Sequence, residues 1–225
     1  MSALWSFETD DPHSVLDRHP APDATAAAAV ARGLFPESVA VPGVLTPLAD
    51  VRTADRVLYV GRYPGVTVVC SGELTVAHPS RLAQRWARPN ALFLGADAEK
   101  SWGAYAIWEN GTLRRSFSAT DVTILEDEGL PLVWELPFWS GERPIERAPG
   151  VIPDPQSLPF DPRELADEAR ERVLGTIDPT AIMLCRFDIY DPADAPRPEP
   201  EPAPPPPIVA APPPPKRRWF RRKRR

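Results

Sequence analysis

The distribution of proline divides this chain into a part that can fold and a part that cannot build a core. The chain has 225 residues and 31 prolines, and 13 of these prolines lie between Asp191 and Arg225. Proline lacks a backbone N–H and fixes φ, so such a density excludes regular helices and central strands. We predict a globular body at residues 1–190, a disordered proline-rich spacer at 191–215 and a basic cluster at 216–225.

The charges are distributed as unevenly as the prolines. The chain has 31 acidic and 26 basic residues, a net charge of −5. Four acids and nine bases lie from residue 191 onward, so residues 1–190 hold 27 acids and 17 bases, a net charge of −10. The remainder carries +5. This asymmetry indicates a tail that meets an anionic partner.

The cysteines and the N-terminus favour a cytoplasmic protein. Cys70 and Cys185 form no C-x-x-C pair and no disulfide framework. The opening residues MSALWSFETDD have no basic n-region, and no run approaches the roughly 20 apolar residues of a spanning helix. A reducing compartment is therefore expected.

Local patterns in the body predict an α+β domain. The clearest is a hairpin over 104–118, because Asn110-Gly111 suits a type I′ turn. On its second strand, Leu113 and Phe117 are expected on one face. Other apolar runs predict strands or extended segments at residues 3–7, 39–41, 56–61, 66–70, 91–94, 122–125 and 182–190. The sheet is expected to be mixed or antiparallel.

About three helices are expected beside the sheet. A helix is predicted over 23–34, with Asp23 as its cap and Gly33 as its end signal, and residues 79–86 are expected to form a short helix. Asp161 and Pro162 begin the best-marked helix, which Gly175 ends. The seven prolines within 131–160 exclude regular helix there. The aromatic residues in that stretch (Trp134, Phe138, Trp139 and Phe160) indicate an ordered loop pinned to the body.

Several segments resemble an actinobacterial domain family of unknown function. The matching motifs are the AYAIWENG hairpin at 104–111, PFWSGE at 137–142 and LPFDPREL at 158–165, supported by YPGV at 63–66 and PSRL at 79–82. The resemblance covers most of residues 1–185 and not the tail, and the opening strand is shorter here than is usual in the family. It implies a fold unit and brings no activity, cofactor or catalytic residue.

Two groups of acidic residues could in principle carry chemistry. Glu8, Asp10, Asp11 and His13 could hold a divalent cation, but a solvated loop with a turn at Asp11-Pro12 is the favoured interpretation. The three histidines (His13, His19 and His78) each adjoin a proline and are expected on the surface. The run 126–128 is interpreted as a charged turn, since side chains in a strand alternate and could not line one pocket together.

No motif assigns a reaction to the body. The chain has no G-x-S-x-G, Walker A or G-x-G-x-x-G pattern, and both cysteines are expected to be buried and inert. We therefore expect no cofactor. Aromatic residues concentrated in the body (Trp102, Trp108, Trp134, Phe138 and Trp139) could frame a groove between 102–118 and 131–160 for a small molecule or for RNA bases. Core packing is the favoured explanation.

The tail is the strongest functional feature. Its tip combines eight cations with two aromatics: Lys216, Arg217, Arg218, Trp219, Phe220, Arg221, Arg222, Lys223, Arg224 and Arg225. The spacer favours polyproline II and could reach about 75 Å at about 3.1 Å per residue. Each basic residue near an anionic membrane contributes about 1 kcal/mol, so full engagement gives at most about 8 kcal/mol, comparable with micromolar binding.

Three partners compete for the tip: an anionic membrane surface, nucleic acid and the acidic body itself. The central Trp219-Phe220 pair favours the membrane, because it can enter the interface. The PPPP runs can also dock a protein partner with an aromatic-lined groove. The leading hypothesis is a non-enzymatic interaction or adaptor protein whose tail attaches it to the inner face of the membrane. A small-molecule enzyme or ligand binder and a nucleic-acid-associated protein are the alternatives.

Overall fold

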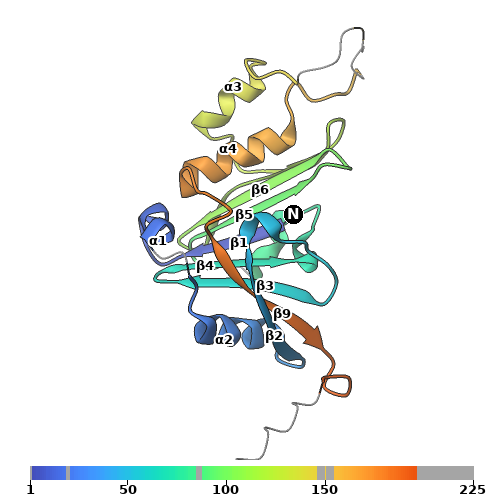
Figure 1. Cartoon of the computed structure of the whole chain (residues 1–225). Coiled ribbons are helices and arrows are strands. Elements are labelled where there is room, and N and C mark those ends of the chain that lie inside the picture. The colour runs from blue at the N-terminus through green and yellow to red at the C-terminus, as the bar shows by residue number, and fades with distance from the viewer. Residues whose placement is uncertain (1, 19–20, 85–87, 146–149, 151–154, 197–225) are drawn as a thin grey trace, which may run out of the picture. The chain divides into compact units, whose positions relative to one another are not determined.

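Nine antiparallel strands form one sheet in the residues that the computed structural model describes, which are 2–18, 21–84, 88–145, 150 and 155–196 (Figure 1). The order across the sheet is β2-β9-β3-β4-β1-β5-β6-β7-β8. The strands are β1 (Ser2–Phe7), β2 (Val39–Pro47), β3 (Val57–Tyr63), β4 (Val66–Ser71), β5 (Ala91–Asp97), β6 (Trp102–Glu109), β7 (Thr112–Ala119), β8 (Ile124–Glu128) and β9 (Met183–Tyr190). The expected α+β class is confirmed, with an antiparallel sheet.

Four α-helices accompany the sheet in these described residues: α1 (Pro12–Arg18), α2 (Ala24–Leu34), α3 (Leu136–Trp139) and α4 (Pro162–Leu174). The expected caps are confirmed. The Asp23 carboxylate accepts a hydrogen bond from the Ala26 amide (2.9 Å), and the Asp161 carboxylate accepts one from the Arg163 amide (2.8 Å). Short 3₁₀ segments lie at η1 (Leu48–Asp50), η2 (Gly72–Leu74), η3 (Pro79–Gln84) and η4 (Val133–Glu135).

The helix predicted over 23–34 is confirmed as α2. Two other predictions need correction. The helix expected at 79–86 is a 3₁₀ segment over 79–84. The turn expected at Asp11-Pro12 is the start of α1 instead. There the Ser14 amide donates to Asp11 Oδ1 (3.0 Å), the pattern of an N-cap followed by proline at the first helical position.

Both faces of the sheet are covered, so the protein has two apolar layers. Helices α1, α3 and α4 pack on the face that carries Trp5, Tyr105 and Phe117. Helix α2 packs on the opposite face, which carries Leu4 and Phe93 (Figure 1). Because both faces are buried, β6 is buried at every residue from 102 to 108 instead of alternating. A Cβ on Gly103 would lie 2.2 Å from the Pro162 carbonyl oxygen, so only glycine lets α4 approach β6 this closely.

The predicted hairpin is confirmed. Asn110 (φ +50°) and Gly111 (φ +78°) connect β6 and β7, and a positive φ at both positions is what a type I′ turn requires. The side chains of β7 do not point to the predicted faces of the sheet. Ile107 pairs with Arg115, but Trp108 pairs with Leu113, so Arg114 is an extra residue in a β-bulge. The bulge puts Leu113 and Phe117 on opposite faces and directs Arg115 into the core.

The chain after β7 also departs from expectation. The strand expected at 122–125 is β8 at 124–128, so the run 126–128 belongs to a strand and not to a turn. The stretch 131–160 does contain helix, since Pro137 lies in the first turn of the four-residue α3, where proline is tolerated. Its aromatic side chains pack on the sheet as predicted.

The chain divides into two units, residues 1–195 and 196–225. The spacer and basic cluster predicted at 191–225 fall almost entirely beyond Pro196, outside the described residues. Among the helices that the structure does describe, none has the length and apolarity needed to cross a bilayer.

Candidate functional site

A buried ion pair organises the chain beyond β8. Arg115 Nε donates to Glu135 Oε1 (3.0 Å) and Arg115 Nη2 donates to Glu135 Oε2 (3.0 Å). Neither side chain has any exposure to solvent. Two parallel bonds between a guanidinium and a carboxylate make a directional contact as well as a strong one. The β-bulge supplies one partner, and the 3₁₀ turn η4 supplies the other.

The same two groups bind the backbone around them. Arg115 Nη1 donates to the carbonyls of Glu128 (3.2 Å) and Gly129 (3.1 Å), and it also contacts the Asp127 carboxylate. Glu135 accepts from the Leu132 amide (2.8 Å). The segment 128–135 is thereby folded around Arg115. A buried charge pair needs this saturation, because an unsatisfied charge in the core is costly.

Two aromatic residues complete this cluster. Trp139 Nε1 donates to Glu135 Oε2 (3.2 Å). The Tyr105 hydroxyl is buried and makes no well-aligned hydrogen bond within the described part of the chain. Burial raises the pKa of Tyr105, and the neighbouring Glu135 carboxylate raises it further. Burial alone would lower the pKa of Arg115, but its bonds to Glu135 and Asp127 outweigh burial and raise it.

These pKa directions keep Arg115 charged and the Tyr105 hydroxyl neutral. A protonated Arg115 and a neutral Tyr105 at physiological pH cannot accept a proton, so neither provides a general base. The cluster instead fixes one conformation of residues 128–139. The predicted alternation of the acidic run is also visible here, because Asp127 turns to Arg115 while Glu126 and Glu128 turn to Ser80.

The fixed segment exposes aliphatic side chains that the sequence patterns did not single out. Leu130 is 85 % exposed, Val133 is 83 % exposed and Leu136 is 53 % exposed. Val133 and Leu136 are three residues apart on successive helical turns, so they lie on the same side. We call residues 130–136 the aliphatic segment. Single exposed aliphatics are ordinary on a protein surface, but three in seven residues on a rigid support are not.

The tryptophans considered for a groove lie on two different faces of the sheet, in agreement with the favoured interpretation of core packing. Trp102 and Trp108 belong to the layer beneath α2, whereas Trp134 and Trp139 pack on the other layer. In that layer the rings of Trp139 and Phe160 meet edge to face at 5.0 Å between centroids. These four indoles therefore do not line one groove, and their packing accounts for the aromatic concentration.

The N-terminal group of possible metal ligands is dispersed. Asp11 caps α1, Glu8 pairs with Arg62 (3.3 Å), and His13 Nε2 lies 3.0 Å from the Thr176 carbonyl oxygen. Across the described residues, no three His, Cys, Asp or Glu side chains form a group suited to a metal ion. His13 and His78 are exposed as expected, and His19 lies outside the described residues.

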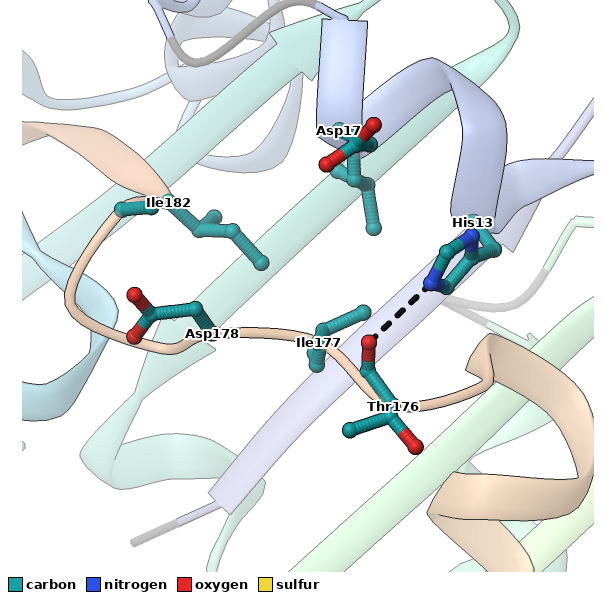
Figure 2. A pocket seen from close by; sticks show the side chains of 8 residues that line it. His13, Asp17, Thr176, Ile177, Asp178 and Ile182 are labelled. Atoms are coloured by element: carbon teal, nitrogen blue, oxygen red, sulfur yellow. Dashed lines mark hydrogen bonds between the residues drawn. The ribbon is translucent and has the colours of Figure 1, made fainter.

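A small pocket lies beside His13 (Figure 2). Asp17 of α1 and Asp178 of the α4–β9 connection also line it, above a floor that includes Leu16 and Ile182. Its volume is about 80 Å³, far below the roughly 300–1,000 Å³ of typical ligand sites. The His13–Thr176 contact joins α1 to the chain after α4, which is a structural role.

Both cysteines are buried and free. Burial raises the pKa of the Cys70 thiol to about 12 and also raises the pKa of Cys185. A thiol is a nucleophile only as the thiolate, so the expected inertness of Cys70 and Cys185 has a physical basis.

The basic cluster of residues 216–225 lies outside the described residues, so it stays a prediction. Comparison with known proteins gives one match. A model of a family of unknown function (DUF6928) matches residues 1–189. No curated protein and no solved structure matches the chain.

Proposed function

The chain belongs to a family of unknown function (DUF6928), and we propose that it is a non-enzymatic interaction protein. In this proposal the folded body binds a protein partner through the aliphatic segment. The basic tail contacts an anionic membrane surface and keeps the protein at the cytoplasmic face of the membrane. The exposed aliphatic segment on its buried ion pair is the observation that carries the proposal for the body.

The support for a protein partner is energetic. A buried ion pair seldom adds net stability over apolar residues of the same size, but it can specify one conformation. Here it specifies the conformation of a segment whose three aliphatic side chains gain nothing from being in water. A partner that covers them would recover that free energy.

The surroundings of the aliphatic segment define the chemistry of the partner. Asp127 and Glu128 are exposed at the end of β8 that leads into the aliphatic segment, and the body as a whole carries −10. An apolar surface with an acidic border complements an apolar surface with a basic border. We therefore propose a protein partner with basic residues around an aliphatic contact.

Photo-crosslinking in cells tests the role of the body. Benzoylphenylalanine replaces Val133 in one variant and the exposed Thr25 of α2 in a matched control. We expect one discrete adduct at position 133 that Leu136→Asp abolishes, and no such adduct at position 25. Identical adducts at both positions, or none at position 133, would contradict an interaction site at the aliphatic segment. Mass spectrometry of the adduct identifies the partner and shows whether its contact is basic.

Vesicle sedimentation tests the role of the tail. Full-length protein and a 1–190 truncation are compared on vesicles of phosphatidylserine and phosphatidylcholine, and on phosphatidylcholine alone. Because residues 216–225 include eight basic residues, the full-length protein should pellet with anionic vesicles only. The truncation should pellet with neither kind of vesicle. Trp219→Ala with Phe220→Ala should weaken binding without removing its dependence on charge.

Equal pelleting of the two chains would exclude the membrane role. The nucleic-acid alternative has a different signature, because the logarithm of RNA affinity would fall with the logarithm of salt concentration at a slope of about −0.7 per phosphate contact. Strong RNA binding together with no vesicle binding would replace the membrane proposal by that alternative.

A further inference from the structure

A groove of about 510 Å³ opens on the α2 face of the sheet, within the roughly 300–1,000 Å³ of small-molecule sites. The strand register explains its lining. Leu4 of β1 pairs with Val69 of β4, and both are buried in its floor. Helix α2 adds Val30 and Leu34 to the same lining. One part of the groove is therefore aliphatic.

The next row of side chains along the same strands is polar. Ser6 pairs with Thr67, and Thr67 pairs with Arg62 of β3, so these three residues share the face of Leu4 and Val69. Two residues along a strand correspond to about 7 Å. An apolar row and a hydrogen-bonding row thus lie side by side in one groove, and the register of three strands produces this arrangement.

Arg62 is held in a fixed orientation within the polar row. Its Nη1 donates to the carbonyl oxygens of Tyr63 (3.1 Å) and Val66 (3.5 Å), and its side chain is only 26 % exposed. Its Nη2 faces the carboxylate of Glu8. Arg88 adds a second, exposed cation to the lining of the groove. A guanidinium held as that of Arg62 is well suited to bind an oxyanion.

The contact with Glu8 shows that Arg62 can bind a carboxylate. The Nη2–Oε2 distance is 3.3 Å, longer than the 2.7–2.9 Å or so of a good charge-assisted bond, and Glu8 is 69 % exposed. An exposed surface pair of this kind is weak and exchangeable. A ligand carboxylate can therefore replace Glu8 on Arg62 at little cost.

We propose that this groove binds a small amphipathic anion, with its oxyanion on Arg62 and its aliphatic part over Leu4, Val30 and Val69. This binding site is separate from the aliphatic segment and from the tail. The ligand class is a carboxylate with a chain of several carbon atoms, because an oxyanion alone would leave the apolar row uncovered.

Titration of the full-length chain with octanoate tests the proposal, with amide chemical shifts in β1 and β4 as the readout. Because those amides report on the groove, any octanoate at the basic tail is distinguished from octanoate in the site. We expect saturable shifts at Ser6 and Thr67. Octanol should bind more weakly because it has no charge, and acetate more weakly because it has no aliphatic chain.

Two substitutions should change octanoate affinity in opposite directions. Arg62→Gln should weaken binding by roughly tenfold or more, since it removes a charged hydrogen-bond donor. Glu8→Gln should strengthen binding a few-fold, because it removes the competing carboxylate. Arg56→Gln is the matched control, since Arg56 is exposed and pairs with Asp191 outside the groove. Val30→Trp should block binding by filling the aliphatic part.

The opposite signs keep the proposal falsifiable if Arg62→Gln disturbs folding, because Glu8→Gln and Val30→Trp remain informative. Shifts that do not saturate, or octanol or acetate binding as tightly as octanoate, would overturn the proposal. Unchanged affinity in Glu8→Gln and Val30→Trp would overturn it as well.

Discussion

Exposed aliphatic side chains occur near both edges of the sheet, and the two groups are supported in different ways. At one edge, β2 exposes Val39, Val44 and Leu45. This strand also carries Pro42 and Pro47 and an irregular register, which are the usual devices that protect a sheet edge from unwanted pairing. Its exposed residues follow from its place at the edge.

At the other edge, beyond β8, the aliphatic segment is held by groups from inside the core. Arg115 and Glu135 are both fully buried. Together they form hydrogen bonds with four residues between positions 127 and 132. An edge-protecting device needs no such support. The two edges therefore differ in their support: buried charged groups hold residues 130–136, whereas prolines and an irregular register shape β2.

The largest expected effect comes from breaking the ion pair. Glu135→Ala leaves the buried Arg115 with only the partly exposed Asp127 carboxylate as a charged partner, so we expect a loss of up to about 3–5 kcal/mol in the free energy of unfolding. Val44→Ala at the β2 edge should change it by less than about 0.5 kcal/mol. Urea denaturation of both variants measures the contrast. Similar values for the two would show that the ion pair does not support its segment in the way described.

Replacing both charges separates stability from conformation. Arg115→Met with Glu135→Leu removes both buried charges, so it should cost much less stability than Glu135→Ala, although the hydrogen bonds of both groups are lost. The carbonyls of Glu128 and Gly129 lose their donor, so hydrogen exchange should accelerate at the amides of 130–136 and not at those of 39–47. Unchanged exchange in the aliphatic segment would mean that apolar packing alone fixes its conformation.

The smallest effects on stability are expected at the exposed side chains themselves. Serine at Leu130, Val133 or Leu136, and serine at Val44 or Leu45, should each alter unfolding by less than about 0.5 kcal/mol. The two groups should differ only in function. With benzoylphenylalanine at position 133, serine at Leu130 or Leu136 should weaken the crosslinked adduct, and serine at Val44 or Leu45 should leave it intact. An adduct equally sensitive to both groups would remove the distinction between the edges.

Local chemistry made part of this fold predictable. Asn110-Gly111 defines a hairpin because both residues adopt positive φ readily, whatever surrounds them. The caps at Asp23 and Asp161 bond to amides two or three residues away, so they too depend only on nearby sequence. The inertness of Cys70 follows from its apolar neighbours in β4. The charge difference between residues 1–190 and 191–225 is likewise a property of composition.

Contacts between residues that are distant in the chain depend on the tertiary structure. The bulge at Arg114 puts Leu113 and Arg115 on opposite faces of the sheet, whereas strict alternation along a strand would put them on the same face. Strand β9 lies between β2 and β3, so the β2 edge depends on pairing between residues more than a hundred positions apart, such as Val39 and Tyr190. The groove depends on the pairing of β1 with β4.

Turns, caps and charge are local or additive quantities, so they suffice to predict an acidic α+β body with a proline-rich, basic tail. The folded chain alone decided that Arg115 meets Glu135, that 130–136 is exposed, and that Arg62 shares a groove with Leu4 and Val69. These sites arise from strand register and from the desolvation of charges, and both exist only once separate parts of the chain have packed together.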